Sequence, residues 1–133
     1  MALYVTDTHP LVWWVTGNHS NLSRRAMRCF EDASSGRVMV YLPAAVLWEI
    51  AFLRSLGRTL VRQRGEHWAR SLLDQSGFAL APLDLDVIIE AGQLGLHRDP
   101  FDAAIVATAR VLDLPLITKD QEIVEANLVE VAW

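Results

Sequence analysis

The sequence predicts a single α/β domain of three layers, with helices on both faces of a central parallel sheet of four to five strands. Short apolar runs alternate with helical segments, and each run is continuously apolar rather than alternating with polar residues. Strands of that composition are buried on both faces, as in a parallel sheet. The chain of 133 residues is 52% hydrophobic and shows no internal repeat or linker, so we expect one domain over residues 1–133.

Five short runs have the apolar and often β-branched composition of strands. They cover residues 3–7, 38–42, 78–81, 116–118 and 128–131. We expect the last of them to form an edge of the sheet.

The segments between these runs carry apolar residues at helical spacing, with capping residues at their starts. Helices are expected to open near Thr8, Ser23, Ala44, Asp84, Phe101 and Asp120, and another in the second half of residues 58–77. Thr8, Ser23 and Asp84 are predicted N-caps, whereas Gly17 and Gly57 are predicted to end helices. The helix over residues 44–56 is predicted to be buried, because most of its residues are apolar.

Composition limits the classes of function. The net charge of −4 argues against a general phosphate-binding surface, which is normally basic. The single cysteine, Cys29, excludes an internal disulfide and suits a reducing cytoplasm. No apolar run has the roughly 18–20 residues of a membrane span, and no signal peptide precedes the first strand. We therefore expect a cytoplasmic protein without a membrane segment.

Two features suggest partner surfaces. Arg54, Arg58 and Arg62 recur every four residues, so they would line one helical face if the helix continued past Gly57. Such a strip is either a solvated face, a contact for RNA, or a contact for an acidic segment of an inhibitor. Trp13 and Trp14 cannot face the same side of one helix, so one is expected to be exposed, and tryptophan is favoured at interfaces.

Four carboxylates occupy positions where strands or helices begin, end or pass near the strand ends. They are Asp7, Glu49, Asp102 and Asp120. Ligands of open parallel sheets bind beyond the carboxyl ends of the strands, so these side chains are expected to converge there. Crowded carboxylates repel one another unless a hard cation lies between them. The pattern therefore predicts a divalent-metal site.

Simpler roles exist for two of these acids. Asp102 could be a first-turn acid that complements the helix dipole, and Asp120 could be an N-cap. Glu49 has no such explanation, because it lies among Leu47, Trp48 and other apolar residues, where a lone charge is unfavourable unless it is paired or coordinated.

Four stretches in this order resemble the PIN-domain ribonucleases, in particular the VapC-type toxins of bacterial toxin–antitoxin pairs. They are Asp-Thr-His-Pro-Leu-Val-Trp-Trp at 7–14, Leu-Trp-Glu-Ile-Ala at 47–51, His-Arg-Asp-Pro-Phe-Asp at 97–102 and Leu-Ile-Thr-Lys-Asp at 116–120. The resemblance extends over nearly the whole chain. One departure is Ala103, where many relatives carry an arginine.

The resemblance implies the site residues and the metal. The four acidic metal-site positions of the family match Asp7, Glu49, Asp102 and Asp120. An additional acid of the family matches Asp99, and the hydroxyl positions that border its site match Thr8 and Thr118. The expected cofactor is Mg²⁺ or Mn²⁺. We expect Asp7 and Asp102 to be direct ligands, and Glu49 and Asp120 to act through water or on a second ion. Arg98, next to Asp99, is a candidate for holding the scissile phosphate.

The expected function is that of a toxin which hydrolyses RNA phosphodiesters with metal-activated water. The resemblance also implies a cognate antitoxin, a homodimer and a higher assembly of the two. Two alternatives stay open at this point. One is a non-catalytic PIN-like binding module. The other is a Mg²⁺-dependent phosphatase or receiver-like domain, in which Asp7 would be the nucleophile and Lys119 would hold the phosphoryl group.

Overall fold

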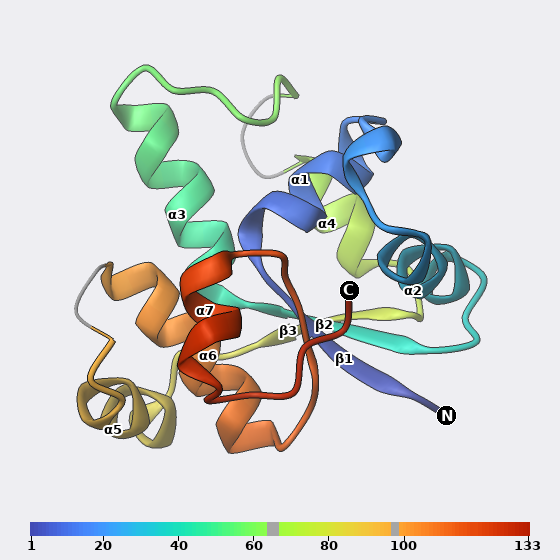
Figure 1. Cartoon of the computed structure of the whole chain (residues 1–133). Helices are drawn as coiled ribbons and strands as arrows, with labels where there is room; N and C mark the ends of the chain where they lie inside the picture. Colours follow the sequence, from blue (N-terminus) through green and yellow to red (C-terminus); the bar gives the residue numbers. More distant parts are fainter. Residues whose placement is uncertain (64–66, 97–98) are drawn as a thin grey trace.

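The computed structural model describes residues 1–63, 67–96 and 99–133. Four parallel strands form one sheet in the order β3-β2-β1-β4 (Figure 1). They are β1 (Leu3–Thr6), β2 (Met39–Pro43), β3 (Phe78–Ala81) and β4 (Leu116–Ile117). Val5 of β1 lies between Tyr41 of β2 and Leu116 of β4, so β1 is a central strand. The predicted α/β class with a parallel sheet is confirmed.

Helices connect successive strands and cover both faces of the sheet. They are α1 (Thr8–Val15), the short 3₁₀ helix η1 (His19–Asn21), α2 (Arg24–Ser34), α3 (Ala44–Ser55), α4 (His67–Leu73), α5 (Leu85–Gln93), α6 (Pro100–Leu112) and α7 (Gln121–Ala126). The chain moves outward from β1 to β3 and then returns to β4. Right-handed crossovers therefore place α1, α2 and α4 on one face and α5 and α6 on the other (Figure 1). Helix α3 contacts both α1 and α6.

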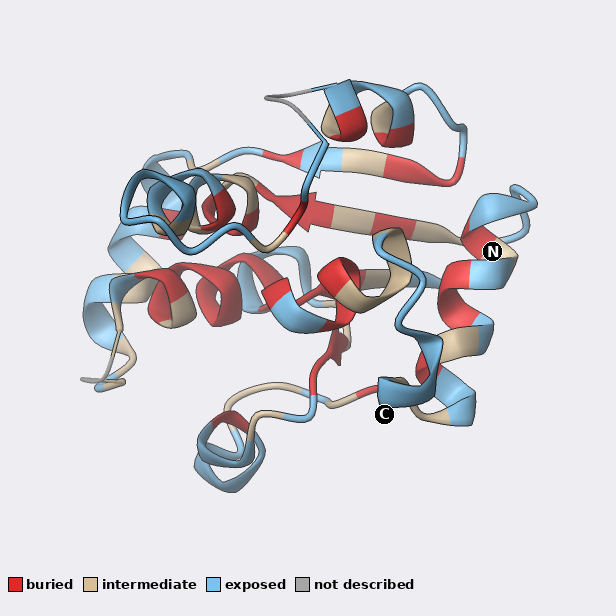
Figure 2. Ribbon diagram, turned by 90° about the horizontal axis from the view of Figure 1, so that it is seen from above, coloured by how far each residue is buried: buried red, intermediate tan, exposed pale blue. Residues whose placement is uncertain are grey.

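The core lies between the sheet and these helices. Val5, Val40 and Leu116 of the central strands are fully buried, and α6 is buried almost continuously from Phe101 to Ala109. Figure 2 shows buried residues along the strands and on the helix sides that face them. Among the residues described, no helix is long and apolar enough to cross a membrane.

Gly77 marks a close approach between the turn before β3 and α2. A Cβ atom at this position would lie 1.8 Å from the carbonyl oxygen of Ala33. The carbonyl oxygen of Gly77 also accepts a hydrogen bond from the backbone N–H of Val40 at 2.8 Å, which begins the β2–β3 pairing. Only glycine fits here without moving the backbone of α2.

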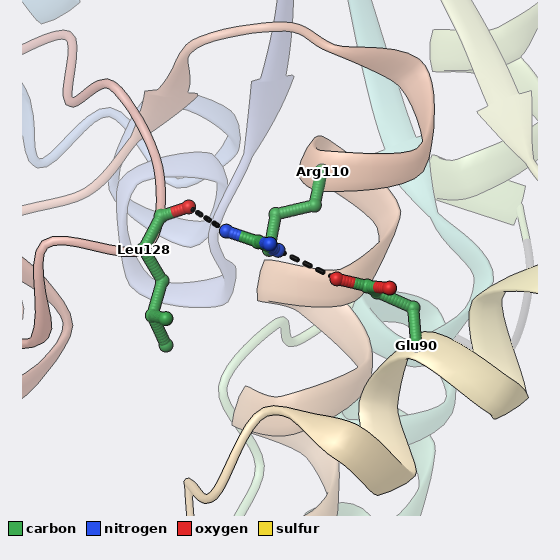
Figure 3. A network of polar contacts seen from close by, with 3 residues as sticks. All are labelled: Glu90, Arg110 and Leu128. Carbon is green, nitrogen blue, oxygen red and sulfur yellow. Dashed lines mark hydrogen bonds and ion pairs between the residues drawn. The ribbon is translucent and has the colours of Figure 1, made fainter.

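A polar contact ties together the helices on the second face. Arg110 of α6 donates to the carboxylate of Glu90 on α5 at 2.6 Å and to the backbone carbonyl of Leu128 at 2.5 Å (Figure 3). The guanidinium thus joins α5, α6 and the segment after α7.

Several element predictions are wrong in detail. Residues 128–131 form no strand, because only Val131 pairs, through an isolated bridge to Leu116. Thr8 is the first residue of α1 rather than its cap, and Asp7 is the N-cap. Helix α3 is not buried throughout, since Trp48 and Phe52 are exposed and only its inner face packs in the core.

The predicted arginine strip does not form. Helix α3 ends at Ser55, and Gly57 has a φ of +84°, which reverses the chain. Arg54 instead donates to the backbone carbonyls of Val61 at 3.4 Å and Gln63 at 3.1 Å, so it braces the segment after the helix. Arg58 and Arg62 lie beyond the turn and share no helical face with Arg54.

The expected exposure of Trp13 or Trp14 is also wrong. Both are half-buried, because Trp14 stacks on Phe30 and Trp13 packs edge-on against Trp133. The exposed tryptophan is Trp48, at 56%.

Candidate functional site

The acidic residues gather around the carboxyl ends of β1 and β4. Asp7 follows β1, Asp120 lies three residues after β4, and Asp99 and Asp102 stand at the start of α6. Glu49 reaches the same place from the middle of α3. Figure 1 shows the starts of α1, α6 and α7 and the lower part of α3 meeting there.

Asp7 is held rigidly at the centre of the site. Its side chain is 7% exposed. One carboxylate oxygen accepts from the backbone N–H of Thr8 at 2.8 Å, and the other accepts from the hydroxyl of Thr118 at 2.7 Å. The backbone N–H of Asp7 donates to the carbonyl of Ile117 at 3.0 Å, so the sheet pairing itself brings Asp7 beside Thr118.

Thr118 links Asp7 to Asp120. Its hydroxyl donates to Asp7 and accepts from the backbone N–H of Asp120 at 3.0 Å. Asp120 in turn caps α7, because one of its oxygens accepts from the N–H groups of Glu122 at 3.0 Å and Ile123 at 3.2 Å. The capping role considered for Asp120 is therefore correct, and it fixes the side chain beside the site.

Glu49 is positioned by Thr8. The Thr8 hydroxyl donates to a carboxylate oxygen of Glu49 at 2.5 Å. Thr8 is fully buried at the first turn of α1, and Glu49 is half-buried. The contact joins α1 to α3 across 41 sequence positions.

Asp99 and Asp102 differ in their contacts. Asp99 is the N-cap of α6 and accepts from the N–H of Phe101 at 2.7 Å. Asp102 lies in the first turn of the same helix. Within the residues that the structure describes, no donor or cation contacts the Asp102 carboxylate. Among the described parts of the chain, the feature that favours its charge is the start of α6.

The carboxylates repel one another. Burial and, after it, the charges of Asp7, Asp99, Asp120 and Glu49 together raise the pKa of Asp102 to about 7. Burial also raises the pKa values of Asp7 and Glu49, against the hydrogen bonds from Thr118 and Thr8 that lower them. Asp120 adds to the rise at Asp7, and Asp99 adds to that at Glu49. Five acids therefore form one electrostatically coupled cluster.

Comparison with known proteins identifies the fold family. A family model described as the PIN domain matches residues 4–128. The chain belongs to the PIN-domain family. No curated protein sequence matches it.

Solved structures are similar to this PIN domain over almost their full length. FitAcB from Neisseria gonorrhoeae has 20% identity and a TM-score of 0.67, with 98% of this chain and 96% of that chain covered. VapBC2 from Rickettsia felis, bound to a DNA fragment from the promoter, has 15% identity and a TM-score of 0.66, covering 97% and 96%. A toxin–antitoxin complex from Klebsiella pneumoniae has 19% identity and a TM-score of 0.62, covering 100% and 98%. At these identities the likeness shows a common fold.

The residues of this PIN domain fit a hard divalent cation. Every side-chain atom of the cluster that could bind a metal is a carboxylate or hydroxyl oxygen, and Mg²⁺ and Mn²⁺ prefer oxygen ligands. In the described part of the chain, no three His, Cys, Asp or Glu side chains converge closely enough to hold an ion together. Mg²⁺ ordinarily uses one or two carboxylates directly and keeps several waters, so its binding does not require three side chains to converge.

A small pocket opens beside Asp7 and Asp120. It has a volume of about 230 Å³, and His9, Pro10, Trp13 and Lys119 form its other walls. The Lys119 ammonium lies 4.8 Å from the centre of the Trp13 ring, a cation–π contact. We did not predict this contact, because Trp13 and Lys119 are far apart in the sequence. Larger hollows lie elsewhere on the surface and contain none of the cluster's acids.

One predicted site residue cannot be placed. Arg98, the candidate for the scissile phosphate, lies outside the described residues. The described residues place the other seven at the carboxyl ends of β1 and β4. They are Asp7, Thr8, Glu49, Asp99, Asp102, Thr118 and Asp120.

Proposed function

We propose that this PIN domain is a divalent-metal-dependent endoribonuclease and the toxin of a toxin–antitoxin pair. The observation that carries the proposal is the cluster of five carboxylates, in which burial and the neighbouring charges together raise the pKa of Asp102 to about 7. A cluster of this kind is unfavourable in an apo protein and favourable around a divalent cation. PIN-family membership and the likeness to toxin–antitoxin structures support the choice of reaction.

We assign the direct metal contacts to Asp7 and Asp102. Asp7 is pre-oriented by Thr8 and Thr118, and each of its oxygens keeps a free lone pair beyond these bonds. Asp102 has no competing donor among the described residues, so its carboxylate is available. Glu49 and Asp120 are held at the border by Thr8 and by the start of α7, where they can orient a water or bind a second ion.

A bound Mg²⁺ or Mn²⁺ would supply charge neutralisation at the scissile phosphate and a water of lowered pKa. The protein residues supply the geometry. Thr118 and Thr8 fix Asp7 and Glu49, and burial of Asp7 excludes bulk water from one side of the site. Fixed ligands of this kind reduce the reorganisation that the reaction requires.

The phosphatase or receiver-like alternative fits the geometry less well. It requires Asp7 as an accessible nucleophile, whereas Asp7 is 7% exposed and both of its oxygens accept hydrogen bonds. Lys119, the only lysine, contacts the Trp13 ring instead of a carboxylate of the cluster. A non-catalytic binding module would not need hydroxyl groups to fix the orientation of these acids.

We further propose a homodimer built on α3 and α5. Each helix exposes an apolar face to solvent, with Trp48, Phe52 and Leu56 on α3 and at its end, and Leu85, Ile88 and Ile89 on α5. Both helices flank α6. Phe101 of α6 contacts Trp48 and Phe52 at ring distances of 4.8 and 5.7 Å, so the α3 face continues into the core.

Charge favours a pairing of α3 with the α5 of a second copy. Arg54 and Arg58 lie near the end of α3, and exposed Asp84 and Asp86 lie at the start of α5. A two-fold axis would bring each basic end against an acidic end twice, as an isologous interface does. A cognate antitoxin is the third partner in the proposal, because several similar structures are toxin–antitoxin complexes.

The test is RNA cleavage by the purified, antitoxin-free protein. Total cellular RNA is incubated with Mg²⁺, with Mn²⁺ and with chelator, using wild type, Asp7→Asn and a control variant. Asp74→Asn is the matched control, because Asp74 is an exposed acid outside both the cluster and the proposed dimer interface. The proposal predicts discrete fragments that need metal, disappear with Asp7→Asn and persist with Asp74→Asn. Absence of cleavage by the wild type under every condition would reject it.

A further inference from the structure

A second hollow lies at the opposite end of β1 from the acidic cluster. It has a volume of about 460 Å³. Three arginines of α2 line it, namely Arg24, Arg25 and Arg28, together with Tyr4 of β1 and with Cys29 and Val38. Helix α2 leads into β2 at the end of the sheet where β1 also begins (Figure 1). We call this hollow the arginine pocket.

The arginine pocket carries an excess of positive charge, with three arginines and one acid among its lining residues. Arg24, Arg25 and Arg28 are exposed, and within the described residues none of them forms an ion pair. The only acid among the lining residues, Asp32, lies 3.7 Å from Arg37 at the far end of α2. The protein as a whole has a net charge of −4, so this concentration of cations is a local feature.

The position of the arginines in α2 makes the charge more unfavourable. The first turn of α2 contains no acid, and Arg24 and Arg25 are its first two residues. The start of a helix already carries partial positive charge, which favours anions there. Cations at this end therefore destabilise the helix unless an anion is bound nearby.

We propose that the arginine pocket binds phosphate groups of the RNA substrate. This inference rests on the proposed ribonuclease function. A guanidinium group can donate two parallel hydrogen bonds to two oxygens of one phosphate, and every basic residue that lines the arginine pocket is an arginine. The half-buried Tyr4 and the apolar Cys29 and Val38 give the pocket a floor against which a base can lie, as unpaired RNA bases do on aromatic side chains.

The arginine pocket lies where it could contact the RNA strand at a distance from the bond that is cleaved. Tyr4 and Asp7 are three residues apart on and just after β1, which is about 10 Å along a strand. The arginine pocket contains no residue of the acidic cluster, so it would hold RNA without taking part in the reaction. An acidic peptide could also pair with arginines, but it would not use the tyrosine floor.

Binding of a labelled oligouridine is measured in chelator, where no cleavage occurs, at several salt concentrations. The proteins are wild type, the double variant Arg24→Ala/Arg28→Ala, and Arg70→Ala as a matched exposed arginine on α4. Each phosphate contact with single-stranded RNA contributes about 0.7 to the slope of log affinity against log salt. The double variant is expected to bind more weakly and to lose about 1.4 from this slope, whereas Arg70→Ala should match wild type.

Equal affinity and slope for the double variant and wild type would overturn the proposal, as would absence of oligouridine binding by the wild type. A double variant that lost binding to polyglutamate but kept its binding to oligouridine would also overturn the proposal. The cleavage assay above is scored separately. Cleavage by the wild type with unchanged binding by the double variant rejects the arginine pocket alone, and weakened binding without cleavage by any protein rejects the ribonuclease alone.

Discussion

Thr118 donates a hydrogen bond to Asp7 at 2.7 Å, although the two residues are 111 positions apart in the chain. The pairing of β1 with β4 brings them together, because the N–H of Asp7 bonds to the carbonyl of Ile117. The same hydroxyl accepts from the N–H of Asp120. One threonine thus sets the orientation of two acids in the cluster.

Thr118→Val should therefore weaken both the site and the fold. It removes a hydrogen bond to a buried carboxylate and leaves the N–H of Asp120 without this partner, which predicts a loss of about 1–3 kcal/mol in unfolding free energy. Metal affinity or activity should fall about 10–100-fold. Thr108→Val is the matched control, because the Thr108 hydroxyl is also buried but donates to the carbonyl of Ala104 within α6, away from the acids of the cluster. Equal metal affinity in the two variants would contradict the role given to Thr118.

The acidic cluster predicts a stability that falls with rising pH when metal is removed. Asp102 has a pKa of about 7 in the folded protein and one near 3.8 when unfolded. At a pH between these two pKa values, the carboxyl group of Asp102 is protonated in the folded state and ionised in the unfolded state. The free energy of unfolding therefore falls as the pH rises towards 7. Asp102→Asn cannot lose a proton. In chelator its melting temperature should exceed that of the wild type, and the difference should be larger at pH 8 than at pH 5.

A wild-type protein that melts at the same temperature as Asp102→Asn at pH 8 would show that folding does not raise the pKa of Asp102. Excess Mn²⁺ offers a second check. Added at pH 8, it should raise the melting temperature of the wild type more than that of the variant, because the ion binds the folded state.

Gly77→Ala should be strongly destabilising. The added methyl group would meet the carbonyl oxygen of Ala33, which belongs to helix backbone and cannot rotate away. We expect a loss of about 1–3 kcal/mol or more, as for overpacked cores, measured by urea unfolding. Gly92→Ala is the matched control, since its Cβ would meet no atom within 4 Å. That variant should be neutral or stabilised by up to about 1 kcal/mol.

The dimer proposal predicts that a charge on α5 will yield monomers. Ile88→Lys places a cation in the exposed apolar face of α5. It should lower the mass measured by light scattering to that of one chain, 14.9 kDa. Val124→Lys alters a similarly exposed apolar residue on α7 and should leave the mass unchanged. A dimeric mass for Ile88→Lys, or a monomeric mass for the wild type, would contradict the proposed interface.

The sequence was informative where a local signal decided the structure. The apolar runs predicted all four strands, and Ser23 and Asp84 were identified as caps because their side chains bond within one turn. Asp7 and Asp120 could be predicted because parallel strands end at a common edge, Glu49 because its neighbours are apolar, and Asp99 from the family resemblance alone. These signals depend on spacing of a few residues or on a general property of the fold.

Features that depend on tertiary contacts were missed. Nothing in residues 128–131 reveals that only Val131 would find a partner. The exposure of Trp48 follows from the packing of α3 between α1 and α6, and the composition of the helix does not reveal it. The arginine pocket is formed by α2 together with Tyr4 and Val38, which precede and follow it in the chain.

Titration of the protein with Mn²⁺ by calorimetry tests the central claim most directly, because it needs no knowledge of the RNA target. The wild type, Asp102→Asn and Asp74→Asn are compared at pH 8. The account predicts saturable binding by the wild type and by Asp74→Asn, and affinity at least about tenfold weaker for Asp102→Asn. Absence of Mn²⁺ binding by the wild type, or equal affinity for Asp102→Asn, would contradict a metal site at this cluster.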